Sequence, residues 1–187
     1  MYFYSGASNA REAYDEASYC ISLIRDYQIT YPVAFDWELD GDYDSVTEAC
    51  ETFCNVISSY GYQPMVYSNR NRWYNNFDGE KIASKYKVWM AAYFGKFYYD
   101  SVRWTYGDDL PNFRYHYDMW QYSSRCYVDG ISGQVDVDIA FFGYANYHVD
   151  TKDAVLTVTN KEIKRTYGDG IGRLTEELNL LDGVKGI

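Results

Sequence analysis

Two acidic side chains stand close together at the end of a predicted strand. The apolar run 32–38 reads PVAFDWE and places Asp36 and Glu38 two residues apart. Because strand side chains alternate between faces, both carboxylates point to the same side. Their mutual repulsion raises at least one pKa, which keeps an acid protonated near neutral pH. Glycoside hydrolysis needs such a pair: one group protonates the leaving oxygen, and the other stabilises or forms the intermediate.

The next segment of the chain offers two other interpretations. Asp40, Asp42 and Asp44 come directly afterwards, as in a solvated surface turn. Their alternate spacing also suits a calcium loop, but the glycine at position six and the glutamate at position twelve of an EF-hand loop are missing. The spacing therefore disfavours calcium and leaves a surface turn and a catalytic pair open.

Strand-like and helix-like segments alternate along the chain. Asn9, with Glu12 three residues on, has the pattern of a capping box and predicts a helix start. Ser45 with Glu48 repeats the pattern before a second apolar helix that ends at Gly61. This alternation predicts a parallel α/β fold, either a barrel or an open sheet. The predicted strands are 2–5, 32–38, 63–68, 88–93, 118–123 and 135–142; a short helix is expected at 69–76, and loops around a cleft at 94–117.

Composition restricts the possible functions. The net charge of −10 argues against nucleic-acid binding, which needs a basic surface. No apolar run approaches the roughly 18 residues of a membrane span. The 23 Tyr, 5 Trp and 9 Phe provide flat faces with polar tips, which suit sugar rings as well as a core.

The four cysteines predict no metal site. Cys20, Cys50, Cys54 and Cys126 are expected to be buried thiols, with a Cys20–Cys54 disulfide as the alternative. Neither histidine stands at metal-ligand spacing, and no glycine-rich phosphate loop is present, so no metal or other cofactor is predicted.

Several segments together carry a family resemblance. They are 2–5, the alanine-rich stretch with Glu12-Ala13 and Glu16-Ala17, 32–38, 61–68, 88–93, 119–123 and 130–138. In this order and spacing, the chain resembles the family 25 glycoside hydrolases, which are Chalaropsis-type lysozymes of bacteria and phages.

The resemblance implies a fold, an activity and a set of site residues. The fold is α/β, a (β/α) TIM-like barrel, and the activity is hydrolysis of the β-1,4 bond between N-acetylmuramic acid and N-acetylglucosamine in peptidoglycan. Glu38 corresponds to the general acid, Asp36 to the residue that tunes it, and Asp136 to the carboxylate of the last strand. Side chains expected to line the saccharide groove, with barrel packing as their alternative role, are Tyr2, Tyr4, Tyr67, Tyr93, Trp120 and Gln121.

The chain departs from this family at its start. Members begin with a strand that bears another active-site aspartate, then a helix and a second strand, whereas Met1 opens at the apparent third strand. We therefore expect a barrel domain at 1–150 that lacks its first two strands through N-terminal truncation. A second copy of the chain is one way to complete such an open barrel, and the activity of the chain on its own is doubtful.

The last residues differ in character from the barrel segments. Residues 151–187 are expected to form a small helical tail. The tail is similar to a degenerate Cpl-7-type cell-wall-binding repeat at 160–163, 167–170, Arg173 and Leu174.

These observations lead to a ranked set of functions. The first is a peptidoglycan hydrolase that acts outside the cell or in the cell wall, although the chain shows no signal peptide. The alternative is a non-catalytic wall-binding protein that has lost part of the active site. A chitinase-like barrel ranks third because the glycine-rich run of alternating aspartates typical of that family is absent.

Overall fold

The computed structural model describes residues 1–95, 110–142, 156–158 and 184–186. The chain divides into two compact units: Met1–Ser101 with Pro111–Ala145, and Val102–Leu110 with Asn146–Ile187. The helices of the first unit are α1 (Ala10–Ile24), α2 (Tyr43–Ser59), α3 (Arg70–Asn75) and α4 (Gly79–Ala83). Its strands are β1 (Tyr2–Ser5), β2 (Val33–Trp37), β3 (Pro64–Asn69), β4 (Lys87–Ala91), β5 (Met119–Cys126) and β6 (Val135–Ala140).

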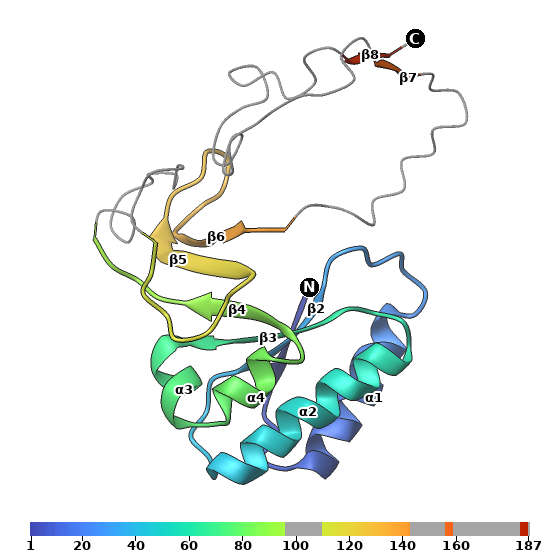
Figure 1. Ribbon diagram of the computed structural model, residues 1–187, viewed down its shortest axis with the longest axis vertical. Coiled ribbons are helices and arrows are strands. Elements are labelled where there is room, and N and C mark those ends of the chain that lie inside the picture. Colours follow the sequence, from blue (N-terminus) through green and yellow to red (C-terminus); the bar gives the residue numbers. More distant parts are fainter. Residues whose placement is uncertain (96–109, 143–155, 159–183, 187) are drawn as a thin grey trace. The chain divides into compact units, whose positions relative to one another are not determined.

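The six strands form one curled sheet in the order β1-β2-β3-β4-β5-β6 (Figure 1). Strands β1 to β5 run parallel, and β6 runs antiparallel to β5. The predicted parallel arrangement is confirmed for β1 to β5 and wrong for β6, and the sheet has the curl of a half-barrel. All six strand segments expected from the sequence are present; β1 has the predicted ends, and the other five have shifted ends.

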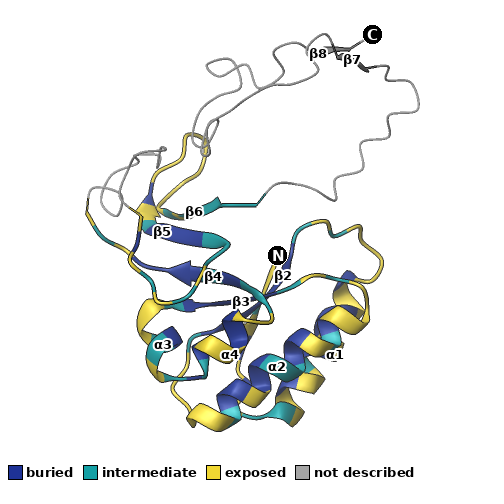
Figure 2. Cartoon of the chain, in the orientation of Figure 1, coloured by how far each residue is buried: buried dark blue, intermediate teal, exposed yellow. Residues whose placement is uncertain are grey.

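The helices cover one face of this sheet. Helices α1 and α2 pack together, and the ring of Phe53 on α2 lies 4.9 Å from the ring of Phe35 on β2. The buried side chains of both helices face the sheet, and the central strands β2 to β5 are the most deeply buried elements (Figure 2). No helix of the described residues packs on the opposite face near β2 (Figure 1).

Side-chain capping sets the starts of α1 and α2; the predicted start of α1 is confirmed, and that of α2 is corrected. Asn9 caps α1 as predicted, because its Oδ1 accepts a hydrogen bond from the amide of Glu12 at 3.1 Å. Helix α2 starts earlier than predicted, because Asp42 and not Ser45 is its N-cap. The Asp42 carboxylate accepts hydrogen bonds from both the amide and the hydroxyl of Ser45, at 3.1 and 2.9 Å.

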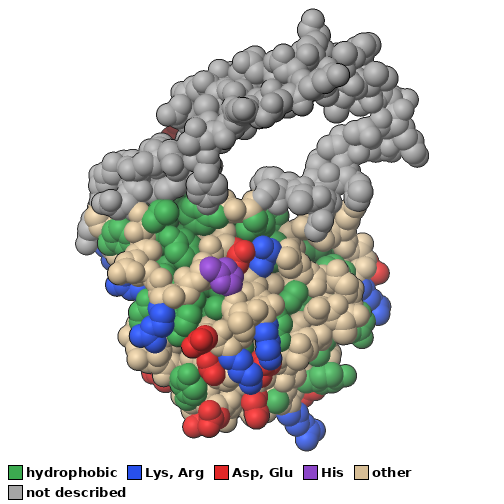
Figure 3. Space-filling view, in the orientation of Figure 1, with side chains coloured by type: hydrophobic (Ala, Val, Ile, Leu, Met, Phe, Trp, Pro, Cys, Tyr) green, Lys and Arg blue, Asp and Glu red, His purple; other side chains and the backbone are tan. Residues whose placement is uncertain are grey.

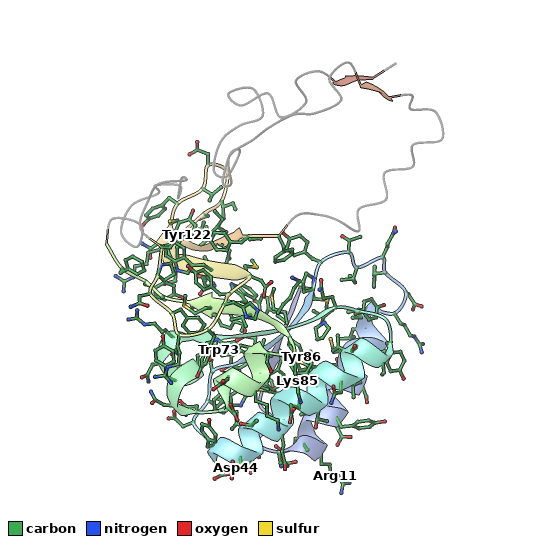
Figure 4. All side chains as sticks on the ribbon, viewed as in Figure 1. Arg11, Asp44, Trp73, Lys85, Tyr86 and Tyr122 are labelled. Atoms are coloured by element: carbon green, nitrogen blue, oxygen red, sulfur yellow. The ribbon has the colours of Figure 1, made fainter. Side chains whose placement is uncertain are left out.

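An aromatic cluster joins α3 to the segment 111–117. Trp73, which is labelled in Figure 4, is fully buried. Its ring contacts those of Phe77, Phe113 and Tyr115. Part of the aromatic content that suggested a sugar groove therefore serves packing. Helix α4, which comes after this cluster's Phe77, was not foreseen.

The structure also bears on the expected cysteine state and on the expected tail. All four cysteines are buried free thiols, as predicted. Within 151–187, the described residues are the antiparallel pair β7 (Leu156–Val158) and β8 (Val184–Gly186). The expected helical part of the tail lies outside the described residues. None of the helices in the described ranges has the length and apolar character needed to cross a membrane.

The packing of α4 against the aromatic cluster is tested by Gly79→Ala. A methyl group at this position would lie 2.5 Å from the carbonyl oxygen of Trp73 and 2.5 Å from Cε2 of Tyr115. Overpacking of this kind costs about 1–3 kcal/mol, more than the helix propensity of alanine returns. We expect the free energy of unfolding, measured by urea denaturation, to fall by about 2 kcal/mol.

Gly6→Ala is the matched control for this measurement. The nearest atom to a methyl group at Gly6 is a carboxylate oxygen of Glu16 at 3.6 Å, an ordinary contact. We expect a change within about 0.5 kcal/mol. Equal stability of the two variants would contradict the packing described for α4.

Candidate active site

Strand β2 presents Asp36 on the face of the sheet that lies away from the helices. Its neighbour Phe35 packs on Phe53 of α2, so the next side chain along the strand points the opposite way. Asp36 is in register with Tyr4 on β1 and with Tyr67 on β3. Residues in register on adjacent strands share a face, so these three side chains begin one surface.

Burial and like charges act together on Asp36. The residue is only 7% exposed, and its Oδ1 has no hydrogen-bond partner among the described residues. Burial, followed by the charges of Glu38 and Asp136, raises the pKa of Asp36 to about 7. Glu38, just beyond β2, is half-buried, and Asp136 is on β6. The three carboxylates named from the sequence therefore lie within electrostatic reach of one another.

A fourth carboxylate, Asp138, joins this group. It is in register with Gln121 on β5, and it accepts a hydrogen bond from Trp89 Nε1 at 2.7 Å. Burial raises the pKa of Asp138 to about 7; the Trp89 hydrogen bond opposes the rise, and the charge of Asp136 adds to it. Sequence reasoning missed Asp138, although strand alternation places it on the same face as Asp136.

Two tyrosines, one on β3 and one just after β4, meet one glutamine of β5. The hydroxyl of Tyr67 donates to Oε1 of Gln121 at 2.7 Å, and the hydroxyl of Tyr93 donates to the same oxygen. Burial, and next the neighbouring Tyr93, raises the pKa of Tyr67 above its ordinary value. Tyr67 and Gln121 are only 7% and 4% exposed, whereas Tyr93 is 38% exposed. Tyr67 and Gln121 are therefore buried beneath this face of the sheet, whereas the ring of Tyr93 is partly exposed to solvent.

Strands β1 and β4 supply further aromatic side chains. Tyr2 and Tyr4 are 60% and 59% exposed. The Trp89 ring lies 4.6 Å from the Tyr67 ring and 6.3 Å from the Tyr2 ring. Trp89, which the sequence did not single out, thus connects the aromatic surface to Asp138.

Trp120 does not belong to this surface. It is fully buried, and its Nε1 donates to the carbonyl oxygen of Ala92 at 2.9 Å. Its ring stacks on Phe94 with centroids 5.5 Å apart. The physical reason is alternation: Gln121 faces the carboxylates, so the preceding residue of the strand faces away. The expected contact of Trp120 with a saccharide is therefore wrong, and its role is packing.

This arrangement suits acid–base chemistry. Asp36 and Asp138 are partly protonated near neutral pH, whereas Glu38 and Asp136 lie nearer the solvent. Neighbouring carboxyl groups in different environments can divide the proton-donating and charge-stabilising roles between them. Among the residues that the structure describes, no group of three His, Cys, Asp or Glu is placed to hold a metal ion.

The sequence and the fold both match known proteins. Residues 1–131 match the profile of the family described as "Glycosyl hydrolases family 25". The lysozyme of Streptococcus phage Cp-1 is 31% identical over 123 residues, which are 61% of this chain and 32% of the phage protein. The chain thus spans about a third of the length of that relative.

Two solved structures share the fold. The CTP1L endolysin superposes with a TM-score of 0.58 and 26% identity, over 74% of this chain and 45% of its own. The autolysin LytC from Streptococcus pneumoniae, in complex with a synthetic peptidoglycan ligand, gives a TM-score of 0.56 and 27% identity, over 73% of this chain and 32% of its own.

The raised pKa of Asp36 predicts a specific dependence of stability on pH. An aspartate in the unfolded chain titrates near pH 4, and Asp36 in the folded chain has a pKa of about 7. Between these values the folded state binds a proton that the unfolded state has lost, so stability falls as the pH rises. Asp36→Asn cannot titrate. We expect it to gain stability relative to the wild type across this window, by up to about 1.4 kcal/mol per pH unit, and then to level off.

Urea unfolding from about pH 4 to pH 8 would measure this difference. Asp42→Asn is the control, because the hydrogen bond from the Ser45 amide lowers the pKa of Asp42. The stability that this carboxylate contributes is lost only as the pH falls below about 4, so the control should show no gain in the window. A pH-independent difference between Asp36→Asn and the wild type would contradict the buried, protonated state of Asp36.

Proposed function

The chain belongs to glycosyl hydrolases family 25, and on that basis we propose that it is a peptidoglycan hydrolase. It acts as a lysozyme, an N-acetylmuramidase that cleaves the β-1,4 bond between N-acetylmuramic acid and N-acetylglucosamine. The observation that carries this proposal is the buried Asp36 beside Glu38 and Asp136 on the face of the sheet away from the helices. The names of the phage lysozyme and of the peptidoglycan-bound autolysin support the substrate.

The proposed chemistry divides the carboxylates by exposure. Glu38 is half-buried and able to meet a bound saccharide, so it acts as the general acid on the glycosidic oxygen. Burial keeps Asp36 partly protonated near pH 7, so it can hold a proton beside Glu38. General acid catalysis by a positioned carboxyl group contributes about 10²–10⁴ in rate.

The carboxylates of β6 act on the developing positive charge. Asp136 carries its charge near the strand end, where an oxocarbenium-like sugar would lie. Asp138 is held in place by its hydrogen bond from Trp89, and it also stabilises this positive charge. The exposed rings of Tyr2, Tyr4 and Tyr93 supply flat apolar faces for the sugar units.

The proposed complete fold is the (β/α) TIM-like barrel of the family. Strand β1 is an edge of the described sheet, because its only partner there is β2. Further strands of such a barrel would pair with this edge, supplied by the same polypeptide or by a second copy. The site of action is the cell wall, outside the cell, where residues 151–187 would add wall affinity as a degenerate binding repeat.

Glu38→Gln tests the proposed chemistry. We expect the release of reducing ends from purified peptidoglycan to fall by at least about 100-fold, because an amide cannot donate the required proton. Binding, measured by co-sedimentation with peptidoglycan, should be retained. Mass spectrometry of borohydride-reduced products should show N-acetylmuramic acid at the new ends.

Glu80→Gln is the matched control, since Glu80 is an exposed residue of α4 and its variant should cleave as the wild type does. If the Glu38→Gln variant cleaves peptidoglycan as fast as the wild type, Glu38 is not the general acid. N-acetylglucosamine at the new ends would refute the proposed bond. Binding without any cleavage by the wild type would favour the alternative function, a non-catalytic wall-binding protein.

A further inference from the structure

A pocket of about 290 Å³ lies beside α3, away from the four carboxylates. Its lining residues are Arg70 and Tyr74 of α3, and Asn112 and Arg114 of the segment 111–117. We name these four residues the arginine pocket. Basic side chains gather over α3 and the adjoining segment at the left edge of Figure 3.

The two arginines are held by contacts to the walls of the pocket. Arg70 Nη1 donates to the carbonyl oxygen of Asn112 at 3.5 Å. The guanidinium group of Arg114 lies 4.7 Å from the centre of the Tyr74 ring, and the amide of Arg114 donates to the Tyr74 hydroxyl at 3.0 Å. These contacts bring two guanidinium groups to one pocket and reduce the entropy that each would lose on binding a ligand.

No acidic side chain in the described part of the chain neutralises the arginine pocket. None of the ion pairs formed among the described residues involves Arg70 or Arg114. The whole chain nevertheless carries a net charge of −10. Two guanidinium groups with no ion-pair partner among the described residues favour an anion in this pocket. The planar fork of each group fits a carboxylate through paired hydrogen bonds.

The arginine pocket lies at the same edge of the sheet as the carboxylates. Arg70 comes directly after β3, three residues after Tyr67, so their Cα atoms lie within roughly 11 Å of each other. Arg72 Nε also donates to the carbonyl oxygen of Leu39 at 3.1 Å, and Leu39 is the residue after Glu38. Helix α3 is thereby tied to the loop that carries the proposed acid.

We propose that the arginine pocket binds a carboxylate of the peptide that branches from the peptidoglycan glycan. This inference rests on the proposed function and names the second part of its substrate. The glycan approaches the carboxylates, and the peptide carries the negative charge. A peptide of four or five residues spans about 13–18 Å, which is enough to connect the two sites.

Titration with the isolated stem peptide tests this proposal without any cleavage step. The peptide is released from purified peptidoglycan by an amidase, and the arginine Nε–Hε signals of the 187-residue chain are followed by NMR. We expect the signals of Arg70 and Arg114 to move, and the Arg70→Gln/Arg114→Gln double variant to bind at least about tenfold more weakly. A peptide whose carboxylates are converted to amides should bind the wild type more weakly by a similar factor.

Arg11→Gln is the control, because Arg11 is an exposed residue of α1 far from α3 (Figure 4). It should bind as the wild type does. The proposal is overturned if the wild type does not bind the stem peptide, if the double variant binds it equally well, or if the amidated peptide binds unchanged. Stronger binding of a soluble glycerol-phosphate polymer at the same arginines would overturn it in favour of a phosphate-polymer site. If the wild type does not cleave glycan, the proposed function is refuted. The titration still measures peptide binding, because it involves no cleavage step.

Discussion

The site depends on the removal of the Asp36 carboxyl from water, beside two other acids. Such burial is unfavourable for the charged form, so the rest of the strand must hold the side chain in place. Trp37 does this from the opposite face: its Nε1 donates to the carbonyl oxygen of Ala7 at 3.1 Å, and its own carbonyl accepts from the Ser68 hydroxyl at 2.8 Å. Together with Phe35 against α2, these contacts prevent β2 from turning its acid towards solvent.

Buried polar pairs extend this rigidity across the sheet. The Trp89–Asp138 hydrogen bond joins β4 to β6, and the Tyr67–Gln121 hydrogen bond joins β3 to β5. Each pair satisfies a polar atom that would otherwise be costly to bury. The groups that set the geometry are thus the buried ones, and the exposed Tyr2 and Tyr4 rings remain available to a ligand.

Opposite charges are divided between two parts of one sheet edge. The carboxylates lie on β2 and β6, and the arginine pocket lies at α3, which begins where β3 ends. The Leu39 contact of Arg72 connects these regions through backbone and side chain. A substrate with an uncharged glycan and a negatively charged branch matches this separation of charges. A polymer with negative charge along its whole length matches it less well, because the carboxylates would repel that polymer.

The sequence by itself determined the features that local rules govern. Period-two alternation placed Asp36 and Glu38 together, the strand and helix pattern predicted the parallel sheet, and Asn9 identified the start of α1. Only the tertiary structure decided the contacts made over long separations. Pairing across β4, β5 and β6 placed Trp120 in the core and Asp138 near the other acids. Packing of 111–117 on α3 formed the arginine pocket. Alternation fixes which residues share a face, but it cannot say which face is covered, because that depends on elements distant in the chain.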